Sequence, residues 1–401
     1  MAQQPFLKSI RPVNLLSFGP DTEEIELRPL NILIGPNGSG KSNLIEVVGL
    51  LGKLSDKDPW SKVRETGGVD EWIWKGNPKQ TVTIGGLPSI QITFHTERPN
   101  DIRNYKIELV KHPATYSFHV HSESITPYPP TVPQTVIYLT RYFKSPDSAS
   151  IYEGKSPNST IENLDVRLPI LAEIFGPSYY KALSDLPLKL SRFALYRDWV
   201  FGAGFIARQP VSAGQPVEML LENASNLAQL LARYQSDFRP TFDLINELMK
   251  KFYEPIKGVE VRIVSTHLQI AILEDGGFSI PAYRLSDGTL RWLALLAILL
   301  NPTPGPVTCI EEPELGLHPD IIPTLADLLR DASTRTQLIL TTHSRTLVEC
   351  FSDDPESVCV CEKFNGATEI KRLEADRMKV WLEKYSLGQL WSSGEIGGNR
   401  W

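Results

Sequence analysis

The chain has 401 residues, 41% of them hydrophobic, which is enough for one large domain or two ordinary ones with a sizeable core. Its formal net charge of −6 excludes binding to nucleic acid through bulk positive charge, so any such contact needs a local basic face. Four clustered cysteines do not suggest a disulfide framework, and residues 1–10 show no secretory signal. The longest apolar run, residues 292–300, has nine residues, where a membrane span needs about twenty. We therefore expect a cytoplasmic protein with reduced thiols and no membrane contact.

The first third of the chain is predicted to form short strands. They are rich in β-branched or aromatic residues and are separated by Gly, Pro or Asn. The predicted strands cover residues 30–34, 82–84, 90–94, 105–110, 115–120 and 135–139. Four prolines in residues 126–134 break any regular element, and residues 145–159 are predicted as a polar loop.

The middle of the chain changes to helical patterns, at residues 226–235 and 241–255. In the second of these, apolar side chains recur at three- and four-residue spacing and share one helix face. They are Phe242, Ile245, Leu248 and Phe252. No heptad pattern persists, so a long coiled coil is not expected.

The last third returns to strands and then alternates strand and helix. Strands are predicted at residues 259–265 and 268–273. The alternation follows over residues 307–364 and predicts a parallel sheet with crossover helices.

The segment GPNGSGKS at residues 35–42 fits the pattern G-x-x-x-x-G-K-[ST]. A glycine-rich turn with a chance lysine is the alternative, but an apolar strand precedes the segment and a helix follows it, which favours a phosphate-binding loop. The glycines let backbone N–H groups turn inward around an anion, and the helix adds its positive N-terminal end. Lys41 is predicted to reach the β and γ phosphates of the ligand, and the Ser42 hydroxyl to ligate Mg²⁺. The predicted nucleotide-binding residues of this loop are Gly35, Pro36, Asn37, Gly38, Ser39, Gly40, Lys41, Ser42 and Asn43.

Two further apolar strands end in residues suited to phosphate chemistry. Residues 307–312 (VTCIEE) end in two carboxylates, of which Glu311 is assigned to the metal and Glu312 to orienting or deprotonating the attacking water. Solvated loop acids are the alternative, but the preceding strand is uncharged. His343 follows the strand LILTT and could contact a γ-phosphate, whereas an isolated histidine would more often be structural.

A second anion site is predicted where an apolar helix begins. Ser286, Asp287 and Gly288 precede the helix, and a serine hydroxyl with glycine N–H groups at a helix N-terminus can bind an anion. Taken alone, the sequence Ser-Asp-Gly is better explained as a helix cap.

Four motifs in this order, GPNGSGKS, LSDGT, EEPELGLHP and TTHS, resemble the ABC-type ATPase head. Within that class, the motifs are similar to those of the RecF, SMC and overcoming-lysogenisation-defect branch. More narrowly, they resemble a group of short, RecF-like bacterial proteins predicted to be AAA-type ATPases. The resemblance covers residues 1–145 and 258–401, including the closing residues 385–401, and leaves a mainly helical insertion at 146–257. It implies an α/β fold of the P-loop NTPase class, with a mixed sheet, crossover helices and an antiparallel β lobe.

The resemblance also implies a mechanism. Two heads enclose two ATP molecules, each between the phosphate loop of one subunit and the LSDGT segment of the other. Ser286 and Gly288 would therefore act on the nucleotide of the partner, and a complete site would require a homodimer.

The sequence departs from the transporter pattern at three points. The signature is LSDGT rather than LSGGQ. Asp287 therefore brings a carboxylate near a phosphate, which is unfavourable unless a cation such as Arg284 or Arg291 offsets its charge. The metal-binding acid is a glutamate where transporters usually have aspartate. No clear glutamine loop is present, and Gln91 is the candidate for its role. Phe18 is the candidate for the adenine-stacking aromatic.

Three weaker signals have ordinary explanations. His119 and His121 share a strand face without a third ligand, and Cys359 and Cys361 are likewise a weak pair. The middle segment interleaves basic with aromatic residues, which suits either nucleic-acid contact or a helical surface over an aromatic core. These residues are Lys181, Lys189, Arg192, Arg197 and Arg208, with Phe193, Tyr196, Trp199 and Phe205.

Three functions compete. The first is an ATP-driven dimerisation switch with DNA or a partner nuclease as its output, in genome maintenance or defence against phage. The second is a transporter-type ABC ATPase subunit, against which stand the missing LSGGQ and glutamine loop and the large insertion. The third is an ATP-binding regulatory scaffold with negligible turnover, which Glu312 argues against. No metal-carboxylate nuclease motif is evident, so any DNA cleavage would come from a partner.

Overall fold

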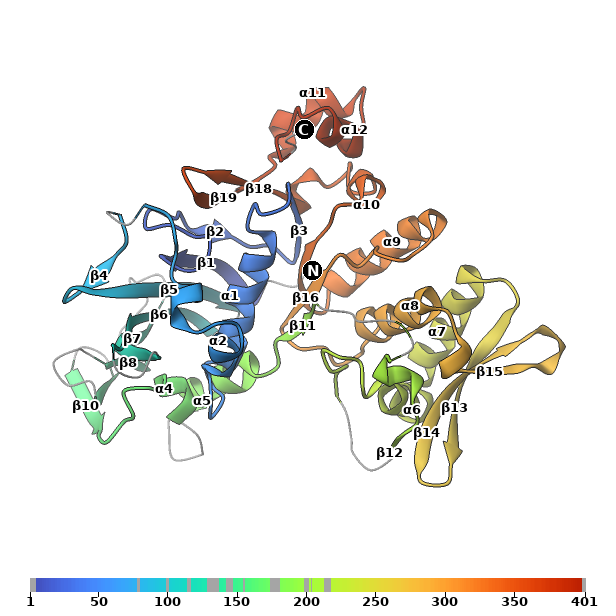
Figure 1. The fold of residues 1–401 in the computed structure, drawn as a ribbon, viewed down its shortest axis with the longest axis horizontal. Coiled ribbons are helices and arrows are strands. Elements are labelled where there is room, and N and C mark those ends of the chain that lie inside the picture. The colour runs from blue at the N-terminus through green and yellow to red at the C-terminus, as the bar shows by residue number, and fades with distance from the viewer. Residues whose placement is uncertain are drawn as a thin grey trace.

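The computed structural model describes residues 5–77, 80–98, 101–113, 117–127, 137–141, 147–153, 156–173, 181–197, 202, 204–212 and 218–398. Its centre is a six-stranded sheet in the order β11-β16-β17-β3-β18-β19 (Figure 1). The strands are β11 Ala194–Tyr196, β16 Val307–Glu311, β17 Gln337–Thr341, β3 Leu30–Ile34, β18 Val358–Phe364 and β19 Ala367–Arg372. All neighbours are parallel except β18 and β19, which confirms the predicted mixed sheet. We call this sheet the P-loop sheet.

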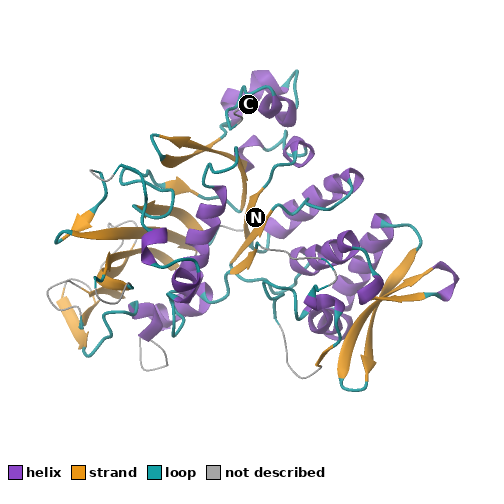
Figure 2. Cartoon of the chain, in the orientation of Figure 1, coloured by secondary structure: helices purple, strands orange, loops and turns teal. Residues whose placement is uncertain are grey.

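Both faces of the P-loop sheet are covered, which explains why its strands are apolar runs rather than alternating patterns. Every residue of β3 and of β17 is buried. On one face Ile32 and Ile34 pack among residues of α8 Asp287–Leu299 and α9 Ile322–Ser333. On the other face Leu33 packs with α1 Lys41–Lys53 and the antiparallel sheet. In Figures 1 and 2, α8 and α9 accordingly lie on one side of this sheet, and α1 lies with the antiparallel strands on the other side.

The antiparallel lobe is a nine-stranded sheet in the order β10-β9-β8-β7-β6-β5-β1-β2, with β4 paired to β5. Its strands are β1 Leu7–Val13, β2 Ile25–Glu26, β4 Thr83–Ile84, β5 Leu87–Arg98, β6 Asp101–Lys111, β7 Phe118–Pro127, β8 Ile137–Arg141, β9 Ala149–Glu153 and β10 Ser156–Ile161. The prediction of a polar loop at residues 145–159 is wrong, because β9 pairs with β8 and β10 pairs with β9. Pairing with a neighbouring strand overrides the weak strand propensity of this polar segment. Residues 128–136, most of the proline-rich stretch and the start of a predicted strand, lie outside the described residues.

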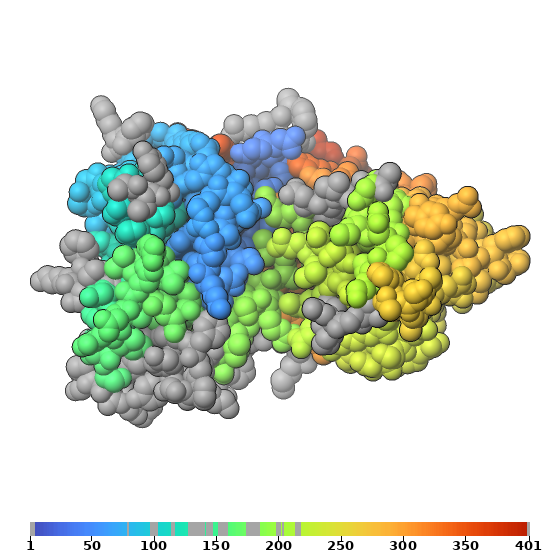
Figure 3. All heavy atoms as spheres, turned by 60° about the horizontal axis from the view of Figure 1, so that its bottom comes forward, coloured from blue at the N-terminus to red at the C-terminus, as the bar shows by residue number. Residues whose placement is uncertain are grey.

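A second lobe packs three helices, α6 Leu227–Asp237, α7 Arg239–Phe252 and α8, against a small antiparallel sheet. The sheet contains β12 Val211–Ser212, β13 Ile256–Val264, β14 His267–Glu274 and β15 Ser279–Pro281. Phe242, Ile245 and Met249 on α7 are buried, as the predicted apolar face requires. Seen from below in Figure 3, this helical lobe and the antiparallel lobe form the two ends of the molecule.

Residues 146–257 contribute strands as well as helices. Strands β9 and β10 extend the antiparallel sheet, and β11 joins the P-loop sheet beside β16.

The remaining helices of the chain are short. They are α2 Ser61–Glu65, α3 Val69–Trp72, α4 Ile170–Glu173, α5 Lys181–Leu190, α10 Arg345–Glu349, α11 Ala375–Leu382 and α12 Leu387–Ser392. Among the described residues no helix combines the length and the apolar composition that crossing a membrane requires.

Trp292 holds the helical lobe together from the middle of α8. Its side chain is fully buried, its ring lies 5.9 Å from that of Phe252, and its indole N–H donates to the Leu248 carbonyl at 3.3 Å. We expect Trp292→Ala to lower the free energy of unfolding by about 3–5 kcal/mol, because a large cavity replaces a packed ring. Denaturant unfolding measures this loss. Tyr253→Ala, which removes a half-exposed ring next to α7, is the control and should cost less than about 1 kcal/mol.

Candidate functional site

The phosphate loop joins β3 to α1 through three glycines with positive φ. Gly35, Gly38 and Gly40 have φ of 150°, 76° and 101°, and Gly40 caps α1 in the left-handed conformation. A Cβ on Gly35 would lie 2.2 Å from the Cys361 carbonyl oxygen, and one on Gly40 would lie 2.1 Å from Oγ1 of Thr368. Glycine is therefore required both by the backbone conformation and by the close approach of β18 and β19.

Two polar groups in the loop suit an anionic ligand. Lys41 is buried, and its Nζ donates to the carbonyl oxygens of Gly35 at 2.8 Å and Pro36 at 3.1 Å. Burial lowers the pKa of the Lys41 ammonium, partly offset by the nearby carboxylates of the β16 end. Oγ of Ser39 is buried and has no hydrogen-bond partner among the described residues. A phosphate would satisfy both groups, so these residues fit ATP. Asn37, Gly38 and Ser42 are exposed at the mouth of the loop, and Asn43 is half-buried.

One acid of the pair, Glu312, and the histidine meet at the ends of adjacent strands. Oε1 of Glu312, just after β16, lies 4.0 Å from Nε2 of His343, just after β17. Glu312 has a φ of 45°, and its N–H donates to the Thr341 carbonyl at 3.0 Å. A left-handed conformation in a non-glycine residue costs free energy and is typical of functional sites. Burial and the positive charge of Lys41 lower the pKa of His343, which favours a neutral imidazole.

Glu314 is a site residue that the sequence analysis missed. Its Oε1 accepts hydrogen bonds from Oγ1 of Thr342 at 2.6 Å and from the backbone N–H groups of His343 at 3.1 Å and Ser344 at 3.2 Å. Burial raises the pKa of this carboxyl. Glu314 therefore fixes the loop that carries His343. The only sequence signal was a third acid in EEPE.

The LSDGT segment caps α8. Oγ of Ser286 accepts from the Thr289 N–H at 3.1 Å, and a Cβ on Gly288 would lie 3.0 Å from the Gly316 carbonyl oxygen. The carboxylate of Asp287 accepts from the Gly202 N–H at 2.9 Å and from the guanidinium of Arg208.

The cation beside Asp287 is not the predicted one. Arg208 is 8% exposed, and it also donates to the carbonyl oxygens of Leu285 at 2.7 Å and Ala282 at 3.1 Å. The expectation that Arg284 or Arg291 offsets this carboxylate is wrong. Arg291 instead donates to the Glu312 carbonyl at 2.6 Å, because one turn into α8 it faces the end of β16.

Two other assignments from the sequence are also wrong. Phe18 is completely buried in the core beneath α1, so its ring cannot stack on a base. Gln91 lies within β5, paired between β1 and β6, and its amide donates to Oγ1 of Thr93 at 3.2 Å. The strand that flanks β16 is β11, and it ends next to Arg197, whose Nε lies 3.2 Å from Oε1 of Glu311. An arginine rather than a glutamine therefore contacts the predicted metal-binding acid.

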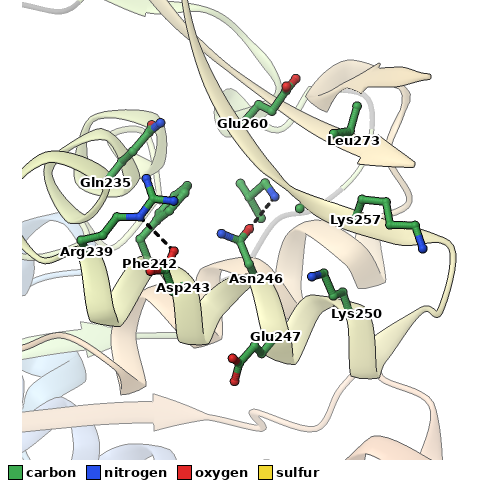
Figure 4. A pocket seen from close by; sticks show the side chains of 12 residues that line it. Gln235, Arg239, Phe242, Asp243, Asn246, Glu247, Lys250, Lys257, Glu260 and Leu273 are labelled. Atoms are coloured by element: carbon green, nitrogen blue, oxygen red, sulfur yellow. Dashed lines mark hydrogen bonds and ion pairs between the residues drawn. The ribbon is translucent and has the colours of Figure 1, made fainter. Parts of the chain in front are cut away.

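Two hollows differ in their relation to this site. One of about 290 Å³ adjoins the start of α1 and is lined in part by Leu16, Ser17, Asn43 and Trp74. The other, of about 350 Å³, lies on α7 and β13 in the helical lobe and is lined mainly by charged side chains of both signs (Figure 4). Three residues of α7 in this hollow already have partners within the lobe, because Arg239 pairs with Asp243 and Asn246 accepts the Val259 N–H. Of these two hollows, only the first adjoins the helix that follows the phosphate loop, through Asn43.

These features define a P-loop ATPase head of the ABC and SMC type. A family model described as "AAA domain, putative AbiEii toxin, Type IV TA system" matches residues 30–349. The chain belongs to this family of AAA domains.

Solved structures support the same fold. The SMC head bound to the C-winged helix domain of ScpA is 16% identical, with a TM-score of 0.51 over 94% of this chain and 100% of that chain. The SMC head of Thermotoga maritima has a TM-score of 0.45 at 16% identity, over 92% of this chain and 99% of that one. The Pyrococcus furiosus SMC head, bound to the C-terminal domain of ScpA, has a TM-score of 0.49 at 14% identity, over 95% of this chain and 99% of that one. At these identities only the fold is shown, and it rests on the first structure. A search of curated proteins finds no match.

Proposed function

We propose that this protein is a Mg²⁺-dependent ATPase that dimerises on ATP and separates after hydrolysis. The observation that carries the proposal is the 4.0 Å approach of Glu312 to His343 at two adjacent strand ends, next to the buried Lys41. DNA or a partner nuclease is the proposed output, in DNA maintenance or antiviral defence in the cytoplasm.

The residues of the phosphate loop bind and orient the nucleotide. The Lys41 ammonium exchanges the carbonyl oxygens of its own loop for the β and γ phosphates, and Ser39 donates its unpartnered hydroxyl. The hollow beside Leu16 and Trp74 is the proposed place of the nucleoside, in the role first assigned to Phe18. Ser42 and Glu311 are the proposed ligands of Mg²⁺, which neutralises charge on the phosphate oxygens.

Glu312 and His343 act on the water and on the γ-phosphate. The carboxylate of Glu312 is 41% exposed, so a water can reach it, and its fixed backbone directs it as the group that orients the water and accepts its proton. Neutral His343 donates a hydrogen bond to the γ-phosphate oxygen. Glu314 keeps His343 in place through the two backbone N–H groups that it binds.

The start of α8 is proposed to serve the nucleotide of a second chain. Ser286 and the N–H groups of Asp287 and Gly288 lie at the start of α8 in the helical lobe, whereas the phosphate loop joins β3 to α1 (Figure 1). Arg208 neutralises Asp287, so that an approaching phosphate does not meet an uncompensated carboxylate. Because Arg208 belongs to residues 146–257, we propose that this segment reports the nucleotide state to the partner or to DNA.

Nucleotide binding provides the direct test. Lys41→Ala should weaken binding of a fluorescent ATP analogue by about 100-fold, because it removes a charge-assisted contact from a buried site. Lys53→Ala, at the exposed end of the same helix, is the control and should bind normally. Unchanged affinity in Lys41→Ala would show that ATP is not bound in this loop.

A further inference from the structure

Three charged side chains meet at the edge of the P-loop sheet where the metal-binding acid lies. Arg197 follows β11, Glu311 ends β16, and Glu46 projects from α1. Nε of Arg197 lies 3.2 Å from Oε1 of Glu311, and its Nη1 lies 3.4 Å from Oε1 of Glu46. The side chains are only 23%, 19% and 16% exposed, respectively. One guanidinium therefore links two largely buried carboxylates that belong to different elements.

The contact between Arg197 and Glu311 is close but poorly directed. Nε of Arg197 and Oε1 of Glu311 are both buried, and neither has a hydrogen-bond partner among the described residues. Strong arginine–carboxylate pairs are bidentate and well aligned, and this pair is not. The Arg197 guanidinium therefore compensates the charge of Glu311 without the directional hydrogen bonds that would make its replacement by another cation costly.

Glu46 lies on the face of α1 that carries the other proposed metal ligand. It follows Ser42 by four residues, which places both side chains on the same side of the helix. Glu46 is therefore able to keep the Arg197 guanidinium after Glu311 has been released. Without Arg197, two partly buried carboxylates would face each other with no compensating cation, which is unfavourable.

We propose that Arg197 is a positioning residue that occupies the Glu311 carboxylate until Mg²⁺ replaces it, and that Glu46 then holds the guanidinium. The proposal rests on the proposed role of Glu311 as a metal ligand. Arg197 thereby raises the Mg²⁺ concentration that the site requires and keeps Glu311 in place when no metal is bound.

Metal dependence gives two predictions of opposite sign. Arg197→Gln should lower the Mg²⁺ concentration for half-maximal binding of a non-hydrolysable ATP analogue by about 5-fold, because the competing cation is gone. Glu46→Gln should raise it by a similar factor, because Arg197 then pairs with Glu311 alone. Arg192→Gln is the matched control. Arg192 lies just before β11, the strand that Arg197 follows, and pairs at 3.4 Å with the exposed Glu218 rather than with Glu311.

Thermal unfolding without nucleotide supplies a readout that does not depend on activity. Without metal, the melting temperature of Arg197→Gln should lie a few degrees below that of the wild type. Mg²⁺ alone should abolish this difference. An unchanged or higher Mg²⁺ requirement in Arg197→Gln would overturn this inference, the latter by showing that Arg197 helps to bind the nucleotide. If the wild type itself binds the analogue without any Mg²⁺ dependence, the proposed role of Glu311 fails instead.

Discussion

Glu312→Gln is expected to bind ATP normally and to hydrolyse it about 10²–10³ times more slowly than the wild type. The amide keeps the shape of the side chain but neither orients the water through a negative charge nor accepts its proton. The backbone of residue 312 stays in place, because its hydrogen bonds to Thr341 and Arg291 do not involve the side chain. Phosphate release under saturating ATP measures the turnover, and titration with labelled ATP measures the binding.

The control for this substitution is Glu349→Gln on α10, the short helix after His343. Glu349 is exposed, and no reacting group contacts it, so its loss should not change turnover. A Glu312→Gln protein that hydrolyses ATP at the wild-type rate would remove Glu312 from the mechanism. Weakened ATP binding in this variant would instead mean that the carboxylate shapes the nucleotide site.

Fold prediction from the sequence succeeded where burial leaves a local pattern. Strands β3, β16 and β17 are almost entirely buried, and each is a short apolar run between turn signals. Prediction failed for β9 and β10, whose polar residues form a hairpin only because β8 offers a free edge to pair with. Phe18 shows the same limit, since an aromatic residue next to a glycine carries no signal that separates core from ligand contact.

The candidate site likewise contains residues that the sequence could predict and residues that it could not. The phosphate loop and the strand-end acids belong to contiguous motifs, in which a strand, a turn and a helix are adjacent in the chain. Arg197 and Arg208 act through contacts with residues far along the sequence, such as the bond between Arg208 and Asp287. Both arginines lie in a stretch of mixed basic and aromatic residues, where an arginine on the surface and one that reaches a buried carboxylate have the same sequence context. Only tertiary contacts separate the two cases, the pairing of β11 with β16 for Arg197 and the bonds to residues 282–287 for Arg208.

The arrangement of the signature predicts what a dimer must do. Ser286 fixes the first turn of α8, and Arg208 binds the backbone of the residues before it. The N–H groups at this end are therefore ordered before any partner arrives, which lowers the entropic cost of closing on a second nucleotide. A bulky cation at residue 286 would destroy this surface without contact with the phosphate loop of its own chain.

Mixing two inactive variants tests whether the signature acts on the other chain. Ser286→Arg should block closure and Lys41→Ala should lose nucleotide binding, so neither homodimer hydrolyses ATP. In a hybrid dimer, the intact phosphate loop of the Ser286→Arg chain meets the intact signature of the Lys41→Ala chain. With random pairing of equal amounts, half of the dimers are hybrids with one working site, so activity should recover to about a quarter of the wild-type value. Ser265→Arg, the same change on the exposed β13–β14 turn, is the control and should remain active alone. No recovery on mixing, or normal hydrolysis by a Ser286→Arg protein that stays monomeric at every concentration, would contradict closure between two chains.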